Sequence, residues 1–406
     1  MILGNKVRLE PNIEQDMAFR RFGGTDRFSW NTSKALYDTM WKDKKEYATI
    51  KDLMKNLQDL KHNNPDYAWL NTIPEAITKQ AMKDLLKAYK EAYKKRKQEP
   101  FDPKNPNKYL PKFKKKGKNN YSFFQRTDNI RKTDDTHIKI TGIKKPVKCT
   151  ALKSVDLPEK ILNPRITFDG KYWYLSYSFD IENTDIIEDF DVEKLGIDLG
   201  VKDLAILSNG EHYRNINKDR EIRKLNKRLK RLQRQISRKY EANAVVGKDG
   251  KKIYHKTNNI KKLEQQTKLI NRRIANIRKT YMYEVIKAVL KTKPQSIILE
   301  DLNIRGMMQN PKLAKAIQEQ NLYRFRQILT YKCQLYGIDL YLADRWYPSS
   351  KTCSCCGWYN PNLKLTDRTF VCEICGLVMD RDENAAKNIQ NCPKNKFKKI
   401  EFKKSA

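Results

Sequence analysis

Four cysteines in the last sixty residues have the spacing of a metal site. Cys353 and Cys356 form one C-x2-C pair, Cys372 and Cys375 form a second, and fifteen residues separate the two pairs. Two such pairs offer four thiolates to one tetrahedral Zn²⁺ ion. A glycine follows each pair, and glycine suits a tight turn around a metal. The spacing therefore predicts a zinc site.

Other cysteines leave alternatives open. Cys355 lies inside the first pair and competes as a ligand, although its C-x-C spacing with Cys353 fits a metal knuckle less well. A redox dithiol pair is the alternative to zinc for the whole cluster. Cys149, Cys333 and Cys392 are isolated, and we expect them to be structural.

Three acidic residues have positions typical of a metal-dependent nuclease. Asp198 lies in the apolar run 195–199, Glu300 ends the apolar run 296–299, and Asp382 precedes an expected helix. A carboxylate at the end of a buried strand loses hydration energy unless a cation offsets the loss. If the three acids converge, they would bind divalent metal, Mg²⁺ or Mn²⁺. Two Mg²⁺ ions about 4 Å apart stabilise both the attacking and the leaving oxygen of phosphodiester hydrolysis.

Each of these acids also has an ordinary explanation. Asp198 suits a turn, Glu300 suits a salt bridge at a strand end, and Asp382 suits a helix N-cap. Together, on a strongly basic chain with a zinc module, they favour the nuclease.

The charge of the chain points to a polyanionic partner. Its 406 residues include 84 Lys and Arg against 48 Asp and Glu, a net charge of +36. This excludes an ordinary metabolic enzyme and favours nucleic acid first and an anionic membrane surface second. A hydrophobic content of 39% is enough for a core, so the chain is not one disordered basic tail. The length suggests two to four domains.

Nothing in the sequence resembles a membrane span or a signal peptide, because no apolar run approaches about 18 residues. We therefore expect an intracellular protein without a membrane partner, cytoplasmic and associated with the nucleoid.

The first half reads as a strand module interrupted by helices. We expect a short strand pair before residue 18, helices over 14–60 and 74–96, and strands between 136 and 180 with a hairpin turn at Asp169-Gly170. An acidic linker, 182–193, follows. The loop 99–120 ends in a basic run just before aromatic residues, which suits phosphate contacts and base stacking. A solvated charge run is the alternative. The candidate contacts are Lys112, Phe113, Lys114, Lys115 and Lys116.

The second half contains two heptad-like segments, 217–240 and 258–279, whose aliphatic residues recur at spacings of three and four. The glycine-containing region 247–250 separates them and predicts an antiparallel helical hairpin. Few acids balance its basic outer faces, which favours a surface facing phosphates over a purely structural hairpin. Its candidate contacts are Arg228, Arg231 and Arg234.

At these residues the chain resembles the TnpB family. These are transposon-encoded RNA-guided endonucleases, also known as OrfB-type transposases and related to type V CRISPR effectors. The resemblance covers nearly the whole chain. It is densest in the segments 196–200 (G-I-D-L-G), 299–303 (L-E-D-L-N), 347–354 (Y-P-S-S-K-T-C-S), 372–376 (C-E-I-C-G) and 382–386 (D-E-N-A-A).

The resemblance implies a multidomain fold of α/β and all-β parts. A wedge β-barrel would cover 1–15 and 120–185, with a helical recognition domain, 16–119, inserted in it. An RNase-H-like RuvC nuclease domain would cover 186–350 and 377–392, with the helical hairpin 217–279 as an insertion. A zinc ribbon would cover 351–376, and a basic tail 393–406.

The resemblance also assigns roles. Asp198, Glu300 and Asp382 fall on the RuvC acids. Asp380 competes for the third place, but the family's acid lies two residues before Asn-Ala-Ala. The four cysteines of the two pairs fall on the zinc ligands, and Arg368 is a candidate phosphate contact.

Such a protein would bind a guide RNA from the transposon end and act as a monomer with it. It would cut duplex DNA beside a short adjacent motif in a Mg²⁺-dependent reaction. A guided repressor or transposition regulator that does not cut is the alternative. A strand-joining transposase ranks last, because its His-hydrophobic-His motif and tyrosine nucleophile are not found.

Overall fold

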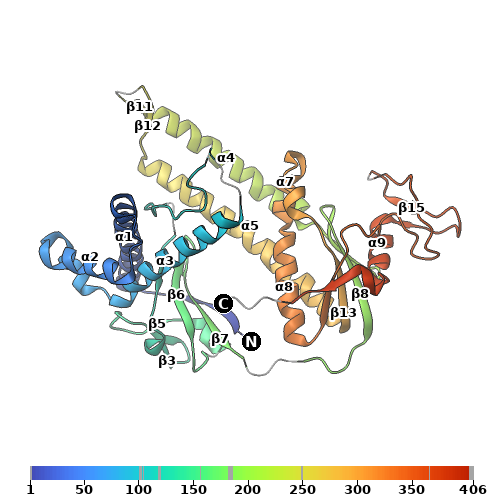
Figure 1. Cartoon of the computed structure of the whole chain (residues 1–406), viewed down its shortest axis with the longest axis horizontal. Helices are drawn as coiled ribbons and strands as arrows, with labels where there is room; N and C mark the ends of the chain where they lie inside the picture. Colours follow the sequence, from blue (N-terminus) through green and yellow to red (C-terminus); the bar gives the residue numbers. More distant parts are fainter. Residues whose placement is uncertain are drawn as a thin grey trace. The chain divides into compact units, whose positions relative to one another are not determined.

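A computed structural model of the protein (Figure 1) describes residues 2–99, 103, 105–117, 120–155, 157–181, 186–247, 250–364 and 366–401. The chain divides into two compact units, Met1–Glu182 and Asn183–Ala406. Parts of several expected segments lie outside the described residues: 100–102, 104, 118 and 119 of the basic loop, 182–185 of the acidic linker, 248 and 249 of the region between the heptad-like segments, 365 of the zinc ribbon, and 402–406 of the tail. In the described chain, no helix is both long and apolar enough to cross a bilayer.

Helices of the first unit break where the sequence pattern suggested continuity. They are α1 (Ile13–Lys44), α2 (Ile50–Asn63), the 3-10 helix η1 (Pro65–Thr72) and α3 (Glu75–Gln98). The helical region expected over 14–60 is confirmed, but it consists of two helices with a break between them. Lys45 ends α1 in a left-handed conformation, φ 58°, and Thr49 starts α2 with a capping box to Asp52. Local capping thus overrides the helical pattern between these residues.

Strands of the first unit form two sheets. A four-stranded antiparallel sheet has the order β1-β7-β6-β2, and a three-stranded sheet has the order β3-β4-β5. The strands are β1 (Ile2–Leu9), β2 (Ser122–Phe124), β3 (Arg131–Asp134), β4 (His137–Lys139), β5 (Val147–Lys148), β6 (Leu162–Phe168) and β7 (Trp173–Asp180). Short 3-10 helices lie between them, η2 (Thr127–Asn129) and η3 (Thr150–Lys153).

Two expectations about these strands were tested. The turn at Asp169-Gly170 is confirmed, because it joins β6 to β7 and Gly170 has a φ of 98°. The N-terminal strand pair is wrong, because β1 pairs with the distant β7 instead of a neighbour. A bridge between Glu10 and Lys148 links the two sheets. The described strands do not show the closed barrel that the resemblance implies.

The second unit is built on a six-stranded sheet with the order β10-β9-β8-β13-β14-β17. Strand β13 pairs in parallel with both β8 and β14, and β9, β10 and β17 extend the sheet in antiparallel fashion. The strands are β8 (Val192–Leu199), β9 (Asp203–Leu207), β10 (His212–Arg214), β13 (Pro294–Glu300), β14 (Asp339–Ala343) and β17 (Phe397–Lys399). Because β8 and β13 are parallel, their carboxyl ends meet at one edge.

Helices cover both faces of this sheet (Figure 1). Side chains of α5 (Asn258–Lys291) and α8 (Leu322–Tyr336) pack on one face, against Ile197, Leu299 and their neighbours. Helix α9 (Arg381–Gln390) packs on the other face through Ile389, against Ile298. The alternation of β8 and β13 therefore places their even-numbered residues, Asp198 and Glu300 among them, on the side of α9.

The expected helical hairpin is present. Helix α4 (Arg220–Ala242) and the first part of α5 pack through Ile222, Leu232, Ile270 and Ile274. Helix α5 continues beyond the expected end at 279 into the core of the sheet. The remaining elements are η4 (Ile216–Lys218), β11 (Ala244–Val246), β12 (Lys252–Tyr254), α6 (Ile304–Met307), α7 (Pro311–Gln320), β15 (Thr369–Val371), β16 (Val378–Asp380) and η5 (Lys394–Lys396).

Gly196 allows α9 to lie directly on β8. A Cβ atom at this position would come within 2.2 Å of the Ala386 carbonyl oxygen and 2.5 Å of the Gln390 backbone nitrogen. Both neighbours are backbone atoms of one helix, so neither can move alone. The glycine is required here by close packing, and its φ is not in the left-handed range.

We expect Gly196→Ala to lower the free energy of unfolding by about 3 kcal/mol, because the added methyl forces α9 away from the sheet. Thermal and urea unfolding measure this loss. The matched control is Gly4→Ala in β1, where the nearest heavy atom to an added Cβ lies 3.9 Å away. Equal stability of the two variants would contradict the packing argument.

Candidate functional site

Helix α9 is aligned with β8 by a series of contacts. The Gln390 side-chain amide donates to the Lys194 carbonyl oxygen at 2.9 Å, and Ala386 lies over Gly196. Asp382 lies one helical turn before Ala386, about 6 Å along the axis of α9. Asp198 lies two residues after Gly196, about 6 to 7 Å along β8. The same alignment therefore directs the N-terminal turn of α9 toward Asp198.

The three candidate acids line one pocket of about 340 Å³. Glu300 lies beside Asp198 because β13 and β8 pair in parallel, with Leu299 opposite Ile197. Arg368, the candidate phosphate contact, also lines this pocket. The structure thus brings together four residues that are far apart in the sequence. Further lining residues are Gly200, Lys202, Asp203, Met307, Ser349, Ser350 and Arg381.

The carboxyl groups of Asp198 and Glu300 are hydrogen-bonded to each other, and the pKa of each is raised. Burial raises the pKa of Asp198 well above its ordinary value, and the charge and hydrogen bond of Glu300 raise it further. Burial also raises the pKa of Glu300, which accepts the hydrogen bond from Asp198. Asp382 adds to both shifts through its charge. Negative charge is therefore in excess in this part of the pocket.

Asp382 is held by two guanidinium groups. Arg381 Nη2 lies 2.8 Å from Asp382 Oδ1, and Arg368 Nη1 lies 3.6 Å from Asp382 Oδ2. Asp380 has a different task. Its carboxylate caps α9 by accepting from the backbone N–H groups of Asp382 and Glu383, and it pairs with Lys202 at 3.7 Å. This geometry favours Asp382 as the acid that faces the pocket.

The acids fit a hard divalent cation by their chemistry. Carboxylate oxygens are the ligands that Mg²⁺ prefers, and Mg²⁺ is commonly held by one or two of them. A bound cation would also offset the excess charge that raises the pKa values of Asp198 and Glu300. Among groups of three or more possible metal ligands in the described residues, only the four cysteines form a cluster, with ligand atoms within 4.8 Å of one another. The three acids line one pocket but do not form such a cluster.

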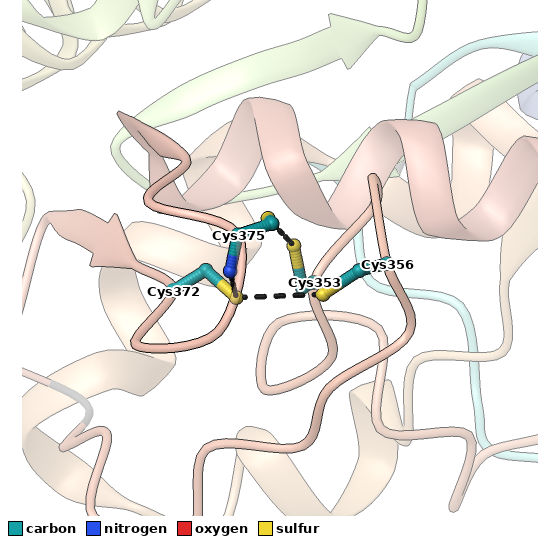
Figure 2. Close-up of side chains that lie close together, drawn as sticks. All are labelled: Cys353, Cys356, Cys372 and Cys375. Atoms are coloured by element: carbon teal, nitrogen blue, oxygen red, sulfur yellow. Dashed lines mark hydrogen bonds between the residues drawn. The ribbon is translucent and has the colours of Figure 1, made fainter.

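The four cysteines of the two C-x2-C pairs converge as predicted (Figure 2). Cys353 Sγ lies 3.6 Å from Cys375 Sγ, and Cys356 Sγ lies 3.5 Å from Cys372 Sγ. Four sulfurs at about 2.3 Å from a tetrahedral zinc ion are about 3.8 Å apart. The cluster therefore fits Zn²⁺ in both ligand type and size.

The backbone forms the same kind of turn after each of the two cysteine pairs. Gly357 has a φ of 79° and Gly376 a φ of 72°, as expected for the turn after each pair. The backbone N–H of each glycine donates to the carbonyl oxygen of the first cysteine of its pair, at 3.0 Å in both cases. Cys355 is exposed and does not belong to the cluster of four. Cys149, Cys333 and Cys392 are buried, as expected of structural cysteines.

Hydrogen bonds prepare one of the thiols for metal binding. Loss of water raises the pKa of Cys372, but N–H groups of Cys375 and Ile374 and the neighbouring thiols outweigh this effect and lower it to about 7. The Cys375 nitrogen lies 3.5 Å from Cys372 Sγ (Figure 2). Cys372 is therefore close to a thiolate at neutral pH.

The cysteine cluster is tied to α9 by two buried asparagines. The side chain of Asn384 accepts from the Ser354 N–H at 2.9 Å and donates to the Thr352 carbonyl at 2.7 Å. Asn388 donates to the Ser349 carbonyl at 2.7 Å. The first cysteine pair therefore helps to place the helix that carries Asp382, and this explains the Asn-Ala-Ala segment physically.

The candidate nucleic-acid contacts differ in their surroundings. Lys114 pairs with the buried Asp26 at 2.9 Å and lies over the Trp30 ring, so its charge is used within the unit. Phe113 is half exposed, with Lys34 over its ring. Lys112, Lys115 and Lys116 lie in the same loop. On the outer face of α4, Arg228, Arg231 and Arg234 are all exposed.

Sequence reasoning missed Arg381, which lines the pocket and binds Asp382. Its only signal was its position immediately before Asp382. The tight fit of Gly196 was also missed, since a glycine in an apolar strand does not reveal which helix approaches it.

We predict that the purified chain contains one zinc ion, and that Cys356→Ser or Cys372→Ser removes it, because three thiolates hold zinc less tightly than four. Metal analysis by mass spectrometry measures the content. Cys355→Ser is the matched control and keeps its zinc. Loss of zinc in that control would place Cys355 among the ligands.

We also predict that Asp198→Asn stabilises the metal-free protein at neutral pH by about 1 to 3 kcal/mol. A carboxyl with a raised folded-state pKa favours folding at low pH, and this contribution is lost as the pH rises through that pKa. The gain of the variant therefore shrinks toward pH 4, near the ordinary pKa of an aspartate.

Calorimetric melting in EDTA across this pH range measures the difference. Asp203→Asn removes another carboxylate that lines the pocket and serves as the control. A pH-independent gain would argue against a raised pKa of Asp198 in the folded protein.

Three family profiles match this chain. Residues 183–311 match the "Probable transposase" profile of IS605 OrfB proteins, and residues 323–389 match "Cas12f1-like, TNB domain". Residues 1–46 match the "Helix-turn-helix domain" of IS605 OrfB proteins. The matched ranges include Asp198, Glu300, the four clustered cysteines and Asp382.

Curated proteins named as putative RNA-guided DNA endonucleases are similar to this chain. The "Putative RNA-guided DNA endonuclease InsQ" of Escherichia coli (strain K12) is 28% identical over 95% of this chain and 90% of that protein. A "Putative RNA-guided DNA endonuclease" of Streptomyces pristinaespiralis is 36% identical over 48% of this chain. That match spans 44% of the Streptomyces protein, less than half of its length.

A solved structure shares the fold. "Cryo-EM structure of the Cas12f1-sgRNA-target DNA complex" aligns with a TM-score of 0.53, covering 94% of this chain and 83% of that one. At 17% identity, this likeness concerns the fold alone. By the profile matches and the curated relatives, this chain is similar to the IS605 OrfB (TnpB) family, and its residues 323–389 match a Cas12f1-like TNB domain.

Proposed function

We propose that this chain is an RNA-guided DNA endonuclease of a transposable element. It takes its guide RNA from the transposon end and cuts DNA beside a short adjacent motif, by Mg²⁺-dependent hydrolysis of phosphodiester bonds. The observation that carries the proposal is the pocket at the edge of β8 and β13, where three acids and two arginines meet. The net charge of +36 favours a polyanion as the substrate of this pocket.

In this proposal Asp198, Glu300 and Asp382 hold divalent metal. When bound, the metal activates the attacking water and stabilises the leaving oxygen. Burial and the charge of Glu300 raise the pKa of Asp198, and a bound cation would favour its ionised form. Arg381 holds the Asp382 carboxylate in place through a direct ion pair at 2.8 Å. Arg368 is about half exposed, so it can bind a phosphate oxygen of the scissile strand at the pocket rim.

We also propose roles for the rest of the chain. The first unit, with its helices α1 to α3 and two sheets, is the recognition and wedge part of the protein. The exposed arginines of α4 follow the backbone of the nucleic acid, and base pairing with the guide reads the sequence. In this assignment Lys112, Lys115, Lys116 and Phe113 contact nucleic acid, while Lys114 mainly stabilises their loop through Asp26.

A guided repressor that binds without cutting is the second candidate. The three acids of the pocket distinguish the guided repressor from the nuclease. A repressor gains nothing from excess negative charge beside a nucleic acid, whereas a metal-dependent nuclease requires it. The raised pKa values of Asp198 and Glu300 therefore favour the nuclease.

We expect the ribonucleoprotein, purified with RNA from its own transposon end, to cut a plasmid library of randomised motifs in Mg²⁺ and to leave it intact in EDTA. Asp198→Ala should reduce cutting by at least about a thousandfold, because metal binding is lost, while guide RNA stays bound. Sequencing of the products and of the bound RNA provides the measurement.

Asp380→Asn is the matched control for the third acid, since Asp380 caps α9 and does not line the pocket. It should retain most of its cutting, whereas Asp382→Asn should not. Enriched binding of a motif without any cut would support the guided repressor instead.

A further inference from the structure

Trp346 is unusually exposed. Its side chain is 86% exposed, the highest value among the large hydrophobic residues that the structure describes. Within the described residues its indole has no hydrogen bond, ring contact or cation above it. Water contact over so much apolar surface is unfavourable, and aromatic residues exposed in this way commonly serve as binding surfaces.

The backbone around Trp346 is held firmly. The Trp346 N–H donates to the Asp344 carboxylate at 2.8 Å, and the Tyr347 N–H donates to the Asp344 carbonyl at 3.0 Å. Arg345 donates to Asp301 through Nε at 3.3 Å to the carbonyl and through Nη2 at 3.0 Å to the carboxylate. The turn is therefore rigid although its indole lies free in solvent, as a preorganised binding group requires.

This turn starts at the edge of the sheet where the acids lie. Strand β14 runs parallel to β13, with Ala343 opposite Glu300, so the chain enters the turn beside that acid. Arg345 binds Asp301, the residue that follows Glu300. A few residues after Trp346 the same loop reaches Ser349 and Ser350, which line the pocket of the acids. Trp346 is thus placed by the elements that place the acids.

We propose that the indole of Trp346 stacks on an unpaired base of the DNA strand that the acids hold, and so positions that strand for cutting. This inference rests on the proposed endonuclease function. A base offers a flat apolar face of the right size, and stacking on aromatic side chains tolerates any sequence. That tolerance suits a protein whose guide RNA reads the sequence.

The surroundings of Trp346 favour nucleic acid over a protein partner. Its exposed neighbours in sequence are Asp344 and Arg345, so it does not belong to a continuous apolar stretch such as a protein interface needs. The Arg345 side chain is 45% exposed and offers positive charge to a phosphate next to the stacked base. A ring beside a cation is the usual arrangement for holding a single strand.

Targets with one abasic site near the cut test this directly. The ribonucleoprotein of the unaltered chain should cut about tenfold more slowly when one particular base is missing, the loss expected for one base stack. Trp346→Ala should be about tenfold slower on the intact target and indifferent to that same abasic site. Trp346→Phe should keep most of the rate. Tyr323→Ala removes another exposed aromatic, 53% exposed on α8, and should cut normally.

Three results would overturn the inference: an abasic profile identical in Trp346→Ala and the unaltered chain, a loss of guide RNA in that variant, or a changed oligomeric state of that variant. The last two would assign the indole to RNA or to a second copy of the chain.

A binding measurement separates this inference from the proposed function. The full chain in EDTA and raised salt is titrated with a short oligothymidylate, so that neither cutting nor simple charge attraction contributes. Trp346→Ala should bind about tenfold more weakly, with Trp346→Phe and Tyr323→Ala close to the unaltered chain. If the unaltered ribonucleoprotein cuts nothing, the endonuclease proposal fails while this result still decides on stacking. Equal affinity in all four proteins would reject the stacking.

Discussion

The close contact between Gly196 and the backbone of α9 is the constraint on which the candidate site depends. A helix can lie this near a strand only where no Cβ intervenes, since an added carbon would come within 2.2 Å of the Ala386 carbonyl. The packing of α9 on β8 in this position fixes where the first turn of the helix lies. Asp382 then faces Asp198, and the parallel pairing of β13 adds Glu300. Three distant segments are thereby brought to one pocket.

The distribution of charge determines what the pocket can bind. Burial raises the pKa values of both Asp198 and Glu300, and the charge of Asp382 raises them further, while Asp382 itself is paired with Arg381 and Arg368. Excess negative charge at the centre and positive charge at the rim suit a cation inside and a phosphate outside. The cysteine cluster serves the same end, because Asn384 joins the first cysteine pair to the helix that carries Asp382.

Local features of the sequence predicted local structure well. The cysteine spacing anticipated a cluster with sulfur distances of 3.5 to 3.6 Å, and the heptad pattern anticipated the α4–α5 hairpin. Predictions were wrong where partners were distant and incomplete where caps intervened. The N-terminal segment pairs with β7 and not with a neighbour, and α1 ends at Lys45 despite a continuing helical pattern. Neither distant pairing nor a left-handed residue leaves a clear periodic signal.

By itself the sequence determined the chemistry that is available: four thiolates at knuckle spacing, three acids beside apolar runs, and a net charge of +36. These follow from residue type and spacing alone, because a metal knuckle is a local structure. The resemblance favoured Asp382 over Asp380, but only the tertiary structure gives the physical reason. Asp380 caps α9, while Asp382 lines the pocket together with Asp198. That choice depends on the rotation of the helix about its axis, which Gly196 and Gln390 set through contacts with a strand nearly two hundred residues away.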